Sequence, residues 1–314
     1  MNPSAPRLFD PQVNGYAGVD FQKDHVSLAE LEHAAAGWRR DGGESFYLTL
    51  ITDAWPKLVG RLRHLRDLLD PASSLRKVVV GWHIEGPFLS EKPGFHGAHD
   101  PACMADPTVA HIRELREAAG DAPVLLTLAP ERPGSIAAIE TACSLGMSVS
   151  LGHTDASADQ IRDAMSAGAT GFTHLANGCP QQLDRHDNIL WRVLESTSLH
   201  IGLIADGIHV SPALFRLIHR WVPSTRLYYT TDAMAAAGAP PGDYTIGRLQ
   251  VRVGEDGIVR QPGRQNFAGS ALAPGRLIDT ATAMLGSGGR SEVFKVVGEA
   301  ARWLEKSELN SGKA

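Results

Sequence analysis

The strongest constraint on the fold is a sequence pattern that repeats along the whole chain. A short apolar run rich in β-branched residues is followed by a turn and then by a stretch with helical periodicity. Eight apolar runs occur, at residues 7–13, 45–52, 77–85, 123–131, 147–155, 171–176, 200–207 and 227–233. The clearest helical stretches lie at residues 28–40, 56–70 and 157–168. Strands that alternate with helices form right-handed βαβ units around a parallel sheet.

Eight such units in 314 residues predict a (β/α)₈ TIM barrel, whose typical length is about 250 residues. The alternative is an open doubly wound sheet, but the GxGxxG turn expected after its first strand is absent. Residues 243–267 alternate apolar and polar positions around Glu255-Asp256-Gly257, which predicts a β-hairpin inserted after the eighth strand. We expect one catalytic domain over residues 1–314, with helical structure from about 274 to 306 and a flexible tail from about 307 to 314.

Composition excludes several classes of protein. The net charge of −5, from 30 basic and 35 acidic residues, gives no general attraction to nucleic acid or to an anionic membrane. No apolar run reaches the roughly 18 residues of a membrane-spanning helix, and the start of the chain lacks the apolar core of a signal peptide. Cys103, Cys143 and Cys179 show no CxxC spacing. We therefore expect a cytoplasmic protein without nucleic-acid or membrane partners.

Acidic and imidazole side chains recur where the predicted strands end, which is the rim that carries the active site of a TIM barrel. They are Glu85, His153, His174, His209 and Asp232. Singly, each has an ordinary structural explanation, such as a buried histidine or a turn-capping carboxylate. Together, Glu85, His153 and His174 form a two-histidine, one-carboxylate set of the kind that catalytic zinc uses. Asp232 would then be the free base beside the water that attacks the substrate.

The same segments resemble N-acetylglucosamine-6-phosphate deacetylases of the amidohydrolase superfamily. The matching segments follow the family's order: Gln12–Gly15, His83–Phe88, Leu128–Glu131, Gly152–Thr154, Thr173–Leu175 with Asn177, Ile204–Gly207 with His209, Thr231–Ala233 and Ala268–Ser270. The resemblance implies a TIM barrel of the metal-dependent amidohydrolase type. It also implies hydrolysis of the N-acetyl amide of an amino-sugar phosphate to acetate and a free amine.

The resemblance further implies a role for individual residues. Glu85, His153 and His174 resemble the metal ligands, and Asp232 resembles the general acid and base. His99 resembles the residue that polarises the substrate carbonyl. By the same resemblance, four groups would hold the sugar and its phosphate: the side chain of Asn177, the backbone of Gly178, and the side chains of Arg185 and His209.

The chain departs from the family pattern in two segments. Many amidohydrolases carry His-x-His at the end of the first strand and bind two metal ions, whereas this chain has Gln12-Val13-Asn14. Glutamine is a poor zinc ligand, so we expect one divalent ion, Zn²⁺ or Fe²⁺, with Gln12 orienting the carbonyl or the water. The loop at residues 177–188 also differs. Arg185 keeps its register as a phosphate partner, and the alternative is a surface ion pair with Asp184 or Asp187.

Too little chain flanks the predicted barrel for the small β-sandwich of the family, so we expect a short form. The resemblance also implies a homodimer, because neighbouring subunits in the family share the substrate site. The leading hypothesis is deacetylation of N-acetylglucosamine 6-phosphate. The alternatives are a hydrolase for another N-acyl amino sugar, without the phosphate, and a non-catalytic sugar-phosphate sensor. Asp232 argues against the sensor, since a structural metal site needs no free base.

Overall fold

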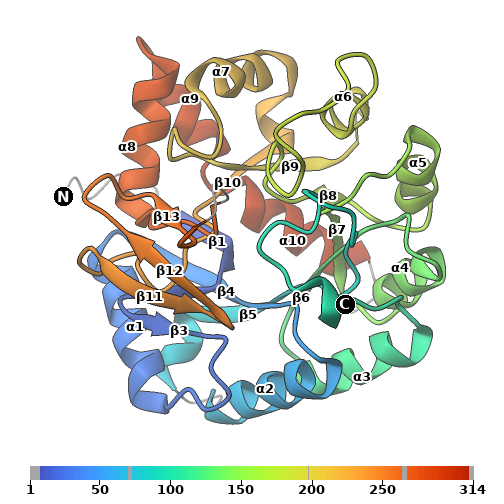
Figure 1. Ribbon diagram of the computed structural model, residues 1–314, viewed down its shortest axis with the longest axis horizontal. Coiled ribbons are helices and arrows are strands. Elements are labelled where there is room, and N and C mark those ends of the chain that lie inside the picture. The colour runs from blue at the N-terminus through green and yellow to red at the C-terminus, as the bar shows by residue number, and fades with distance from the viewer. Residues whose placement is uncertain (1–7, 70–72, 197, 264–266, 311–314) are drawn as a thin grey trace.

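Eight parallel strands form the central sheet of the computed structural model, which describes residues 8–69, 73–196, 198–263 and 267–310 (Figure 1). The spatial order is β1-β4-β5-β6-β7-β8-β9-β10, and each neighbouring pair is parallel. The strand bounds are β1 Leu8–Val13, β4 Gly43–Ile51, β5 Val79–Glu85, β6 Val124–Leu128, β7 Ser148–Leu151, β8 Gly171–Phe172, β9 His200–Ile204 and β10 Leu227–Thr230. Sequential parallel pairing of all eight strands confirms the predicted TIM barrel.

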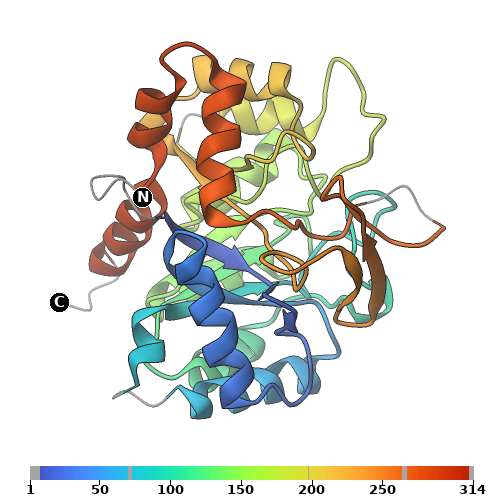
Figure 2. The same ribbon diagram turned by 90° about the vertical axis from the view of Figure 1, so that its left-hand side faces the viewer.

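Helices surround the sheet on its outer face (Figures 1 and 2). They are α1 Leu28–Arg40, α2 Trp55–Leu68, α3 Val109–Ala119, α4 Ser135–Ser144, α5 Ala158–Ser166, α6 Ile189–Glu195, α7 Pro212–Trp221, α8 Pro274–Leu285, α9 Gly289–Val296 and α10 Glu299–Asn310, with 3₁₀ turns η1 Ser74–Lys77, η2 Pro101–Cys103 and η3 Ser224–Arg226. Capping boxes stand at the starts of α1, from Ser27 to Glu30, and of α5, from Ser157 to Gln160. These reciprocal hydrogen bonds explain why both helices begin next to the predicted positions.

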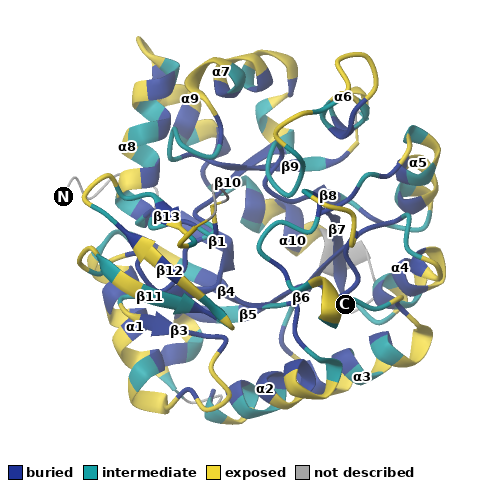
Figure 3. Cartoon of the chain, viewed as in Figure 1, coloured by how far each residue is buried: buried dark blue, intermediate teal, exposed yellow. Residues whose placement is uncertain are grey.

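Apolar side chains fill the space between the strands and the helices. Figure 3 shows in dark blue that most residues of the central strands are buried. Leu48, Ile84 and Leu126 from successive strands are at most 1% exposed. At the opposite end from the site, α10 packs across the barrel and places Trp303 in a cluster with Phe9, Tyr47, Leu125 and Tyr228. α10 continues to Asn310, into the stretch from 307 that we expected to be a tail, and residues 311–314 lie outside the described part.

The insertion after β10 is an antiparallel sheet of three strands, β11 Gly242–Ile246, β12 Leu249–Val253 and β13 Val259–Arg260. The predicted hairpin is confirmed, but its turn lies elsewhere. Ile246 pairs with Leu249, so the tight turn is Gly247-Arg248, where Gly247 has a φ of 59° that favours glycine. The turn around Glu255-Asp256-Gly257 joins β12 to β13 instead. A small ribbon, β2 Gly15–Tyr16 and β3 Val19–Asp20, was not predicted.

No helix among the described residues is long and apolar enough to cross a membrane.

Candidate active site

The structure brings the three predicted metal ligands together at the carboxyl ends of the strands. Glu85 is the last residue of β5, while His153 and His174 lie two residues beyond β7 and β8. The Nε2 atoms of His174 and His153 lie 2.9 and 3.3 Å from Glu85 Oε1. All three residues are at most 6% exposed. A single buried carboxylate therefore faces two imidazoles.

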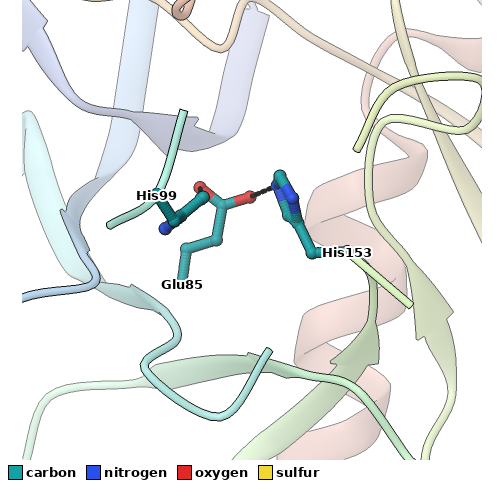
Figure 4. A group of neighbouring side chains, drawn as sticks. All are labelled: Glu85, His99 and His153. Atoms are coloured by element: carbon teal, nitrogen blue, oxygen red, sulfur yellow. Dashed lines mark ion pairs between the residues drawn. The ribbon is translucent and has the colours of Figure 1, made fainter. Parts of the chain in front are cut away.

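His99 brings a third imidazole to the same carboxylate. Its Nε2 lies 3.7 Å from Glu85 Oε2, and Figure 4 shows Glu85 between His99 and His153. The ligand atoms of Glu85, His99 and His153 lie within 4.8 Å of one another. Sequence reasoning gave His99 a place beside the substrate instead. It arrives from the loop after β5, where no strand end marks it.

The donor set fits a divalent cation. His153 Nδ1 lies 2.9 Å from the carbonyl oxygen of Phe95, which can only accept, so Nδ1 carries the proton. In the neutral imidazole the lone pair is then on Nε2, which lies 3.3 Å from Glu85 Oε1. A lone pair that faces a carboxylate oxygen in a buried site is repulsive, and either a proton or a metal cation between the two atoms removes this repulsion. In addition, His174 Nδ1 is a buried atom without a hydrogen-bond partner among the described residues.

The backbone is strained at three of these positions. His153, His174 and Asp232 have φ values of 50°, 27° and 48°, in the left-handed region that non-glycine residues avoid. Each such residue costs about 1–3 kcal/mol, and such strain clusters at functional sites. This conformation is incompatible with a strand. It explains why β7, β8 and β10 end before the boundaries that we predicted for them at residues 155, 176 and 233.

Asp232 lies across the site from Glu85, and Gln12 bridges the two carboxylates. Gln12 Nε2 donates to Asp232 Oδ1 at 3.0 Å and to Glu85 Oε1 at 3.1 Å, while Thr173 Oγ1 donates to Gln12 Oε1 at 2.6 Å. Asn14 Nδ2 also donates to Asp232 Oδ1, at 2.7 Å. Burial, followed by the charge of Glu85, raises the pKa of Asp232 to about 7. An acid poised near neutrality can both accept and return a proton.

These groups line a cavity of about 310 Å³ that also includes Asn177, Gly178 and His209 from the predicted set. Asn177 Nδ2 is buried and has no partner among the described residues, so this donor is free for a ligand. Gln12 is buried behind Asp232 and is not among the lining residues. Asn14 and Phe267 are among the lining residues that had no predicted role. Asn14 lies in the first matching segment, whereas nothing local marks Phe267.

His209 is held at the cavity wall by Asp206. Its Nδ1 lies 2.6 Å from Asp206 Oδ2, and Asp206 Oδ1 accepts from the backbone N–H groups of Ile208 and His209. Burial raises the pKa of Asp206, but the hydrogen bonds from His209 and the backbone outweigh it and hold that pKa below its usual value. The ring of Phe267 meets His209 edge-on at 5.1 Å. Asp206 therefore fixes the orientation of the His209 ring at this wall.

Arg185 lies outside the cavity. It is exposed, and its Nε donates to His186 Nε2 at 3.0 Å. The alternative surface pair is also not found, since Asp187 pairs with Arg192 at 2.6 Å and Asp184 accepts from backbone N–H groups. Among the described residues that line the cavity there is no lysine or arginine. Histidines are thus the only basic side chains among the described residues that line it.

Comparison with known proteins gives a consistent set of relatives, although no protein-family model matches the chain. The chain is 34% identical to an N-acetylglucosamine-6-phosphate deacetylase of Danio rerio over 79% of its length, and it spans only 62% of that relative. It is 31% identical to an N-acetylgalactosamine-6-phosphate deacetylase of Escherichia coli O157:H7, covering 85% of the chain and 69% of the relative.

A solved structure agrees with these relatives. It is a mutant N-acetyl-D-glucosamine-6-phosphate deacetylase of Mycobacterium smegmatis in complex with N-acetyl-D-glucosamine 6-phosphate. It superimposes with a TM-score of 0.87 at 31% identity, over 96% of this chain and 77% of that one.

Proposed function

Because this chain belongs to the N-acetylglucosamine-6-phosphate deacetylase family, we propose that it hydrolyses the N-acetyl amide of N-acetylglucosamine 6-phosphate to glucosamine 6-phosphate and acetate. The observation that carries this proposal is the pairing of a buried carboxylate, Glu85, with a half-buried one, Asp232, in different surroundings. Glu85 faces three imidazoles, whereas Asp232 accepts hydrogen bonds from the side-chain amides of Gln12 and Asn14 and has a pKa raised to about 7. One carboxylate suits cation binding and the other suits proton transfer.

Glu85 and His153 would hold one divalent cation, with His174 as the third ligand. Two histidines and a carboxylate suit Zn²⁺, and Fe²⁺ accepts the same donors. When bound, the cation supplies an acidic water and polarises the amide carbonyl. His99 would contact the carbonyl oxygen from the other side of Glu85. The position of His99 also allows it to be the third ligand in place of His174.

Alanine variants at His99 and His174 distinguish these two assignments. The metal content per chain, measured by elemental analysis after dialysis, should fall in His174→Ala and stay near one in His99→Ala. The reverse pattern would exchange their roles. Because the readout is metal content, it does not depend on the substrate chosen.

Asp232 would perform both proton transfers. It accepts a proton from the attacking water and then delivers it to the amide nitrogen, so that the amine rather than hydroxide is expelled. Gln12 and Asn14 hold its Oδ1 by hydrogen bonds, which orients the carboxylate without neutralising it. Asn177 Nδ2, the backbone of Gly178 and the Nε2 of His209 would bind the sugar and its phosphate.

The absence of lysine and arginine from the described cavity lining favours a second candidate, deacetylation of an N-acyl amino sugar without a phosphate. Arg185 is exposed and is not among the lining residues, so in this conformation it does not supply the positive charge that a phosphate needs.

The decisive measurement is kcat/KM for N-acetylglucosamine 6-phosphate against N-acetylglucosamine, on protein of known metal content. A preference above about a hundredfold, about 2.7 kcal/mol of transition-state binding, would support the phosphorylated substrate. Comparable rates would support the second candidate. Binding of the sugar phosphate without turnover of either compound would refute both and support a sensor.

A further inference from the structure

The barrel has a seam where its first and last strands meet. β1 and β10 are the ends of the sheet order, and in the described part of the chain they share no strand ladder. Their backbones meet at one isolated bridge, Val13 to Ala233, which continues from Ala233 to Ser270. Pro11 lies in β1 and has no N–H to donate, and the register of β1 against β4 shifts between Asp10 and Val13. Figure 1 shows β1 and β10 next to each other.

The side chain of Asp10 fills this seam. Its Oδ1 accepts from the backbone N–H of Gln12 at 3.0 Å and from Thr230 Oγ1 at 2.7 Å. Its Oδ2 accepts from the backbone N–H and the hydroxyl of Thr231, at 2.7 and 2.6 Å. Asp10 is 0% exposed, and burying a carboxylate is costly unless its oxygens are hydrogen-bonded. Here each carboxylate oxygen accepts two hydrogen bonds, and the donors come from β1 and from the residues at the end of β10.

The two threonine hydroxyls extend this contact to the active site. Thr230 Oγ1 accepts from the backbone N–H of Asp232 at 3.2 Å, and Thr231 Oγ1 accepts from the N–H of Ala233 at 3.2 Å. Each hydroxyl therefore donates to Asp10 and accepts from the N–H two residues later. Thr230 Oγ1 also has a longer contact, of 3.4 Å, with the carbonyl oxygen of Gln12. Two chains of hydrogen bonds, here called relays, therefore start at the Asp10 carboxylate. One runs through Thr230 to the N–H of Asp232, and the other runs through Thr231 to the N–H of Ala233.

The relays end at the strained position. Asp232 has a φ of 48°, and its carbonyl oxygen is fixed by the N–H of Ser270 at 3.0 Å. Such a conformation persists only where the surroundings over-determine it. On the β1 side, Asp10 binds the N–H of Gln12, whose side chain donates to Asp232 Oδ1. Asp10 thus anchors both partners of the Gln12–Asp232 hydrogen bond.

We propose that Asp10 is a positioning residue for the reaction, which holds Asp232 and Gln12 in register across the open seam through the hydroxyls of Thr230 and Thr231. Asp10 touches neither the cavity nor the predicted metal ligands, so it acts through these residues alone. The inference rests on the proposed function, because it assumes that Asp232 is the base. An error of about 1 Å in the position of a catalytic group costs about a hundredfold in rate.

The test uses Asp10→Asn, Thr230→Val and Thr230→Ser in the metal-loaded full chain. Asp10→Asn turns an amide NH₂ toward donors that need an acceptor, and Thr230→Val removes one relay with little change in shape. We expect both to lower kcat by about a hundredfold with little change in KM or in metal content. Thr230→Ser keeps the hydroxyl, so its kcat should stay close to that of the wild type rather than fall as in Thr230→Val. Ser135→Ala, which removes a buried hydroxyl at the start of α4, is the control for a purely structural loss and should keep the wild-type kcat.

Two results would overturn the proposal. One is a wild-type kcat in Thr230→Val and Asp10→Asn. The other is a loss of activity that is fully accounted for by a lower folded or metal-loaded fraction, or that Thr230→Ser fails to rescue. Crystal structures of the wild type and Asp10→Asn give a readout without substrate, since the distance of 3.0 Å between Gln12 Nε2 and Asp232 Oδ1 should lengthen. If the wild type deacetylates neither sugar, the proposed function fails, while this distance still tests the relays.

Discussion

Asp232→Asn should remove activity and at the same time stabilise the metal-free protein. The asparagine has the same shape, and its Oδ1 can still accept from Gln12 and Asn14. It cannot take a proton from water, so both proton transfers are lost. General acid–base catalysis contributes about 10²–10⁴-fold per positioned group, and we expect kcat to fall by about a thousandfold or more.

The stability gain follows from the pKa of Asp232, which is raised from 3.8 to about 7 by burial and by the charge of Glu85. Because the folded state holds this proton more tightly than the unfolded state, the metal-free protein loses stability as the pH rises from about 4 to about 7. Three pKa units correspond to about 4 kcal/mol, which the variant should recover at pH 8. A bound cation lowers the pKa of Asp232, so the gain should shrink in the metal-loaded protein.

Urea unfolding of the chelated wild type and variant at pH 5, 7 and 8 measures this difference. Asp53→Asn is the matched control, because Asp53 pairs with Arg61 at 2.7 Å and with Arg248 at 2.6 Å, and its net pKa is lowered. Its loss should destabilise the protein at pH 8, the opposite sign to Asp232→Asn. An Asp232→Asn protein that keeps near wild-type kcat would refute the base assignment. A variant no more stable than the wild type at pH 8 would refute the electrostatic reasoning.

Three further predictions test the remaining parts. Ser27→Ala removes the capping box of α1 and should lower the free energy of unfolding by about 1 kcal/mol, measured with urea, with kcat unchanged. Leu126→Ala empties a fully buried position in β6 and should cost about 2–5 kcal/mol in the same assay; a loss under about 1 kcal/mol would contradict the packing described. His209→Asn removes the imidazole held by Asp206 and should raise KM for the phosphorylated sugar about tenfold or more, while KM for N-acetylglucosamine stays the same; equal changes for both would place His209 away from the phosphate.

Local sequence patterns were sufficient to predict the barrel. The helix at residues 28–40 matches α1 at both ends, because its capping box and its helical periodicity are encoded within a few neighbouring residues. Parallel strands covered on both faces are apolar throughout, so all eight apolar runs correspond to strands. Since the carboxyl ends of such strands share one rim, the sequence alone places Glu85, His153, His174 and Asp232 together.

The tertiary structure decided which atoms meet at that rim. His99 reaches Glu85 from a loop with no periodic signal, and Arg185 keeps its register in the sequence but lies outside the cavity. The hydrogen bonds of Gln12 to Asp232 and of Thr230 to Asp10 each join residues 220 positions apart. Contacts at such separations, and the left-handed backbone that they hold in place, depend on how the first strand closes against the last. Local patterns define the strands, but they do not contain the register of this closure.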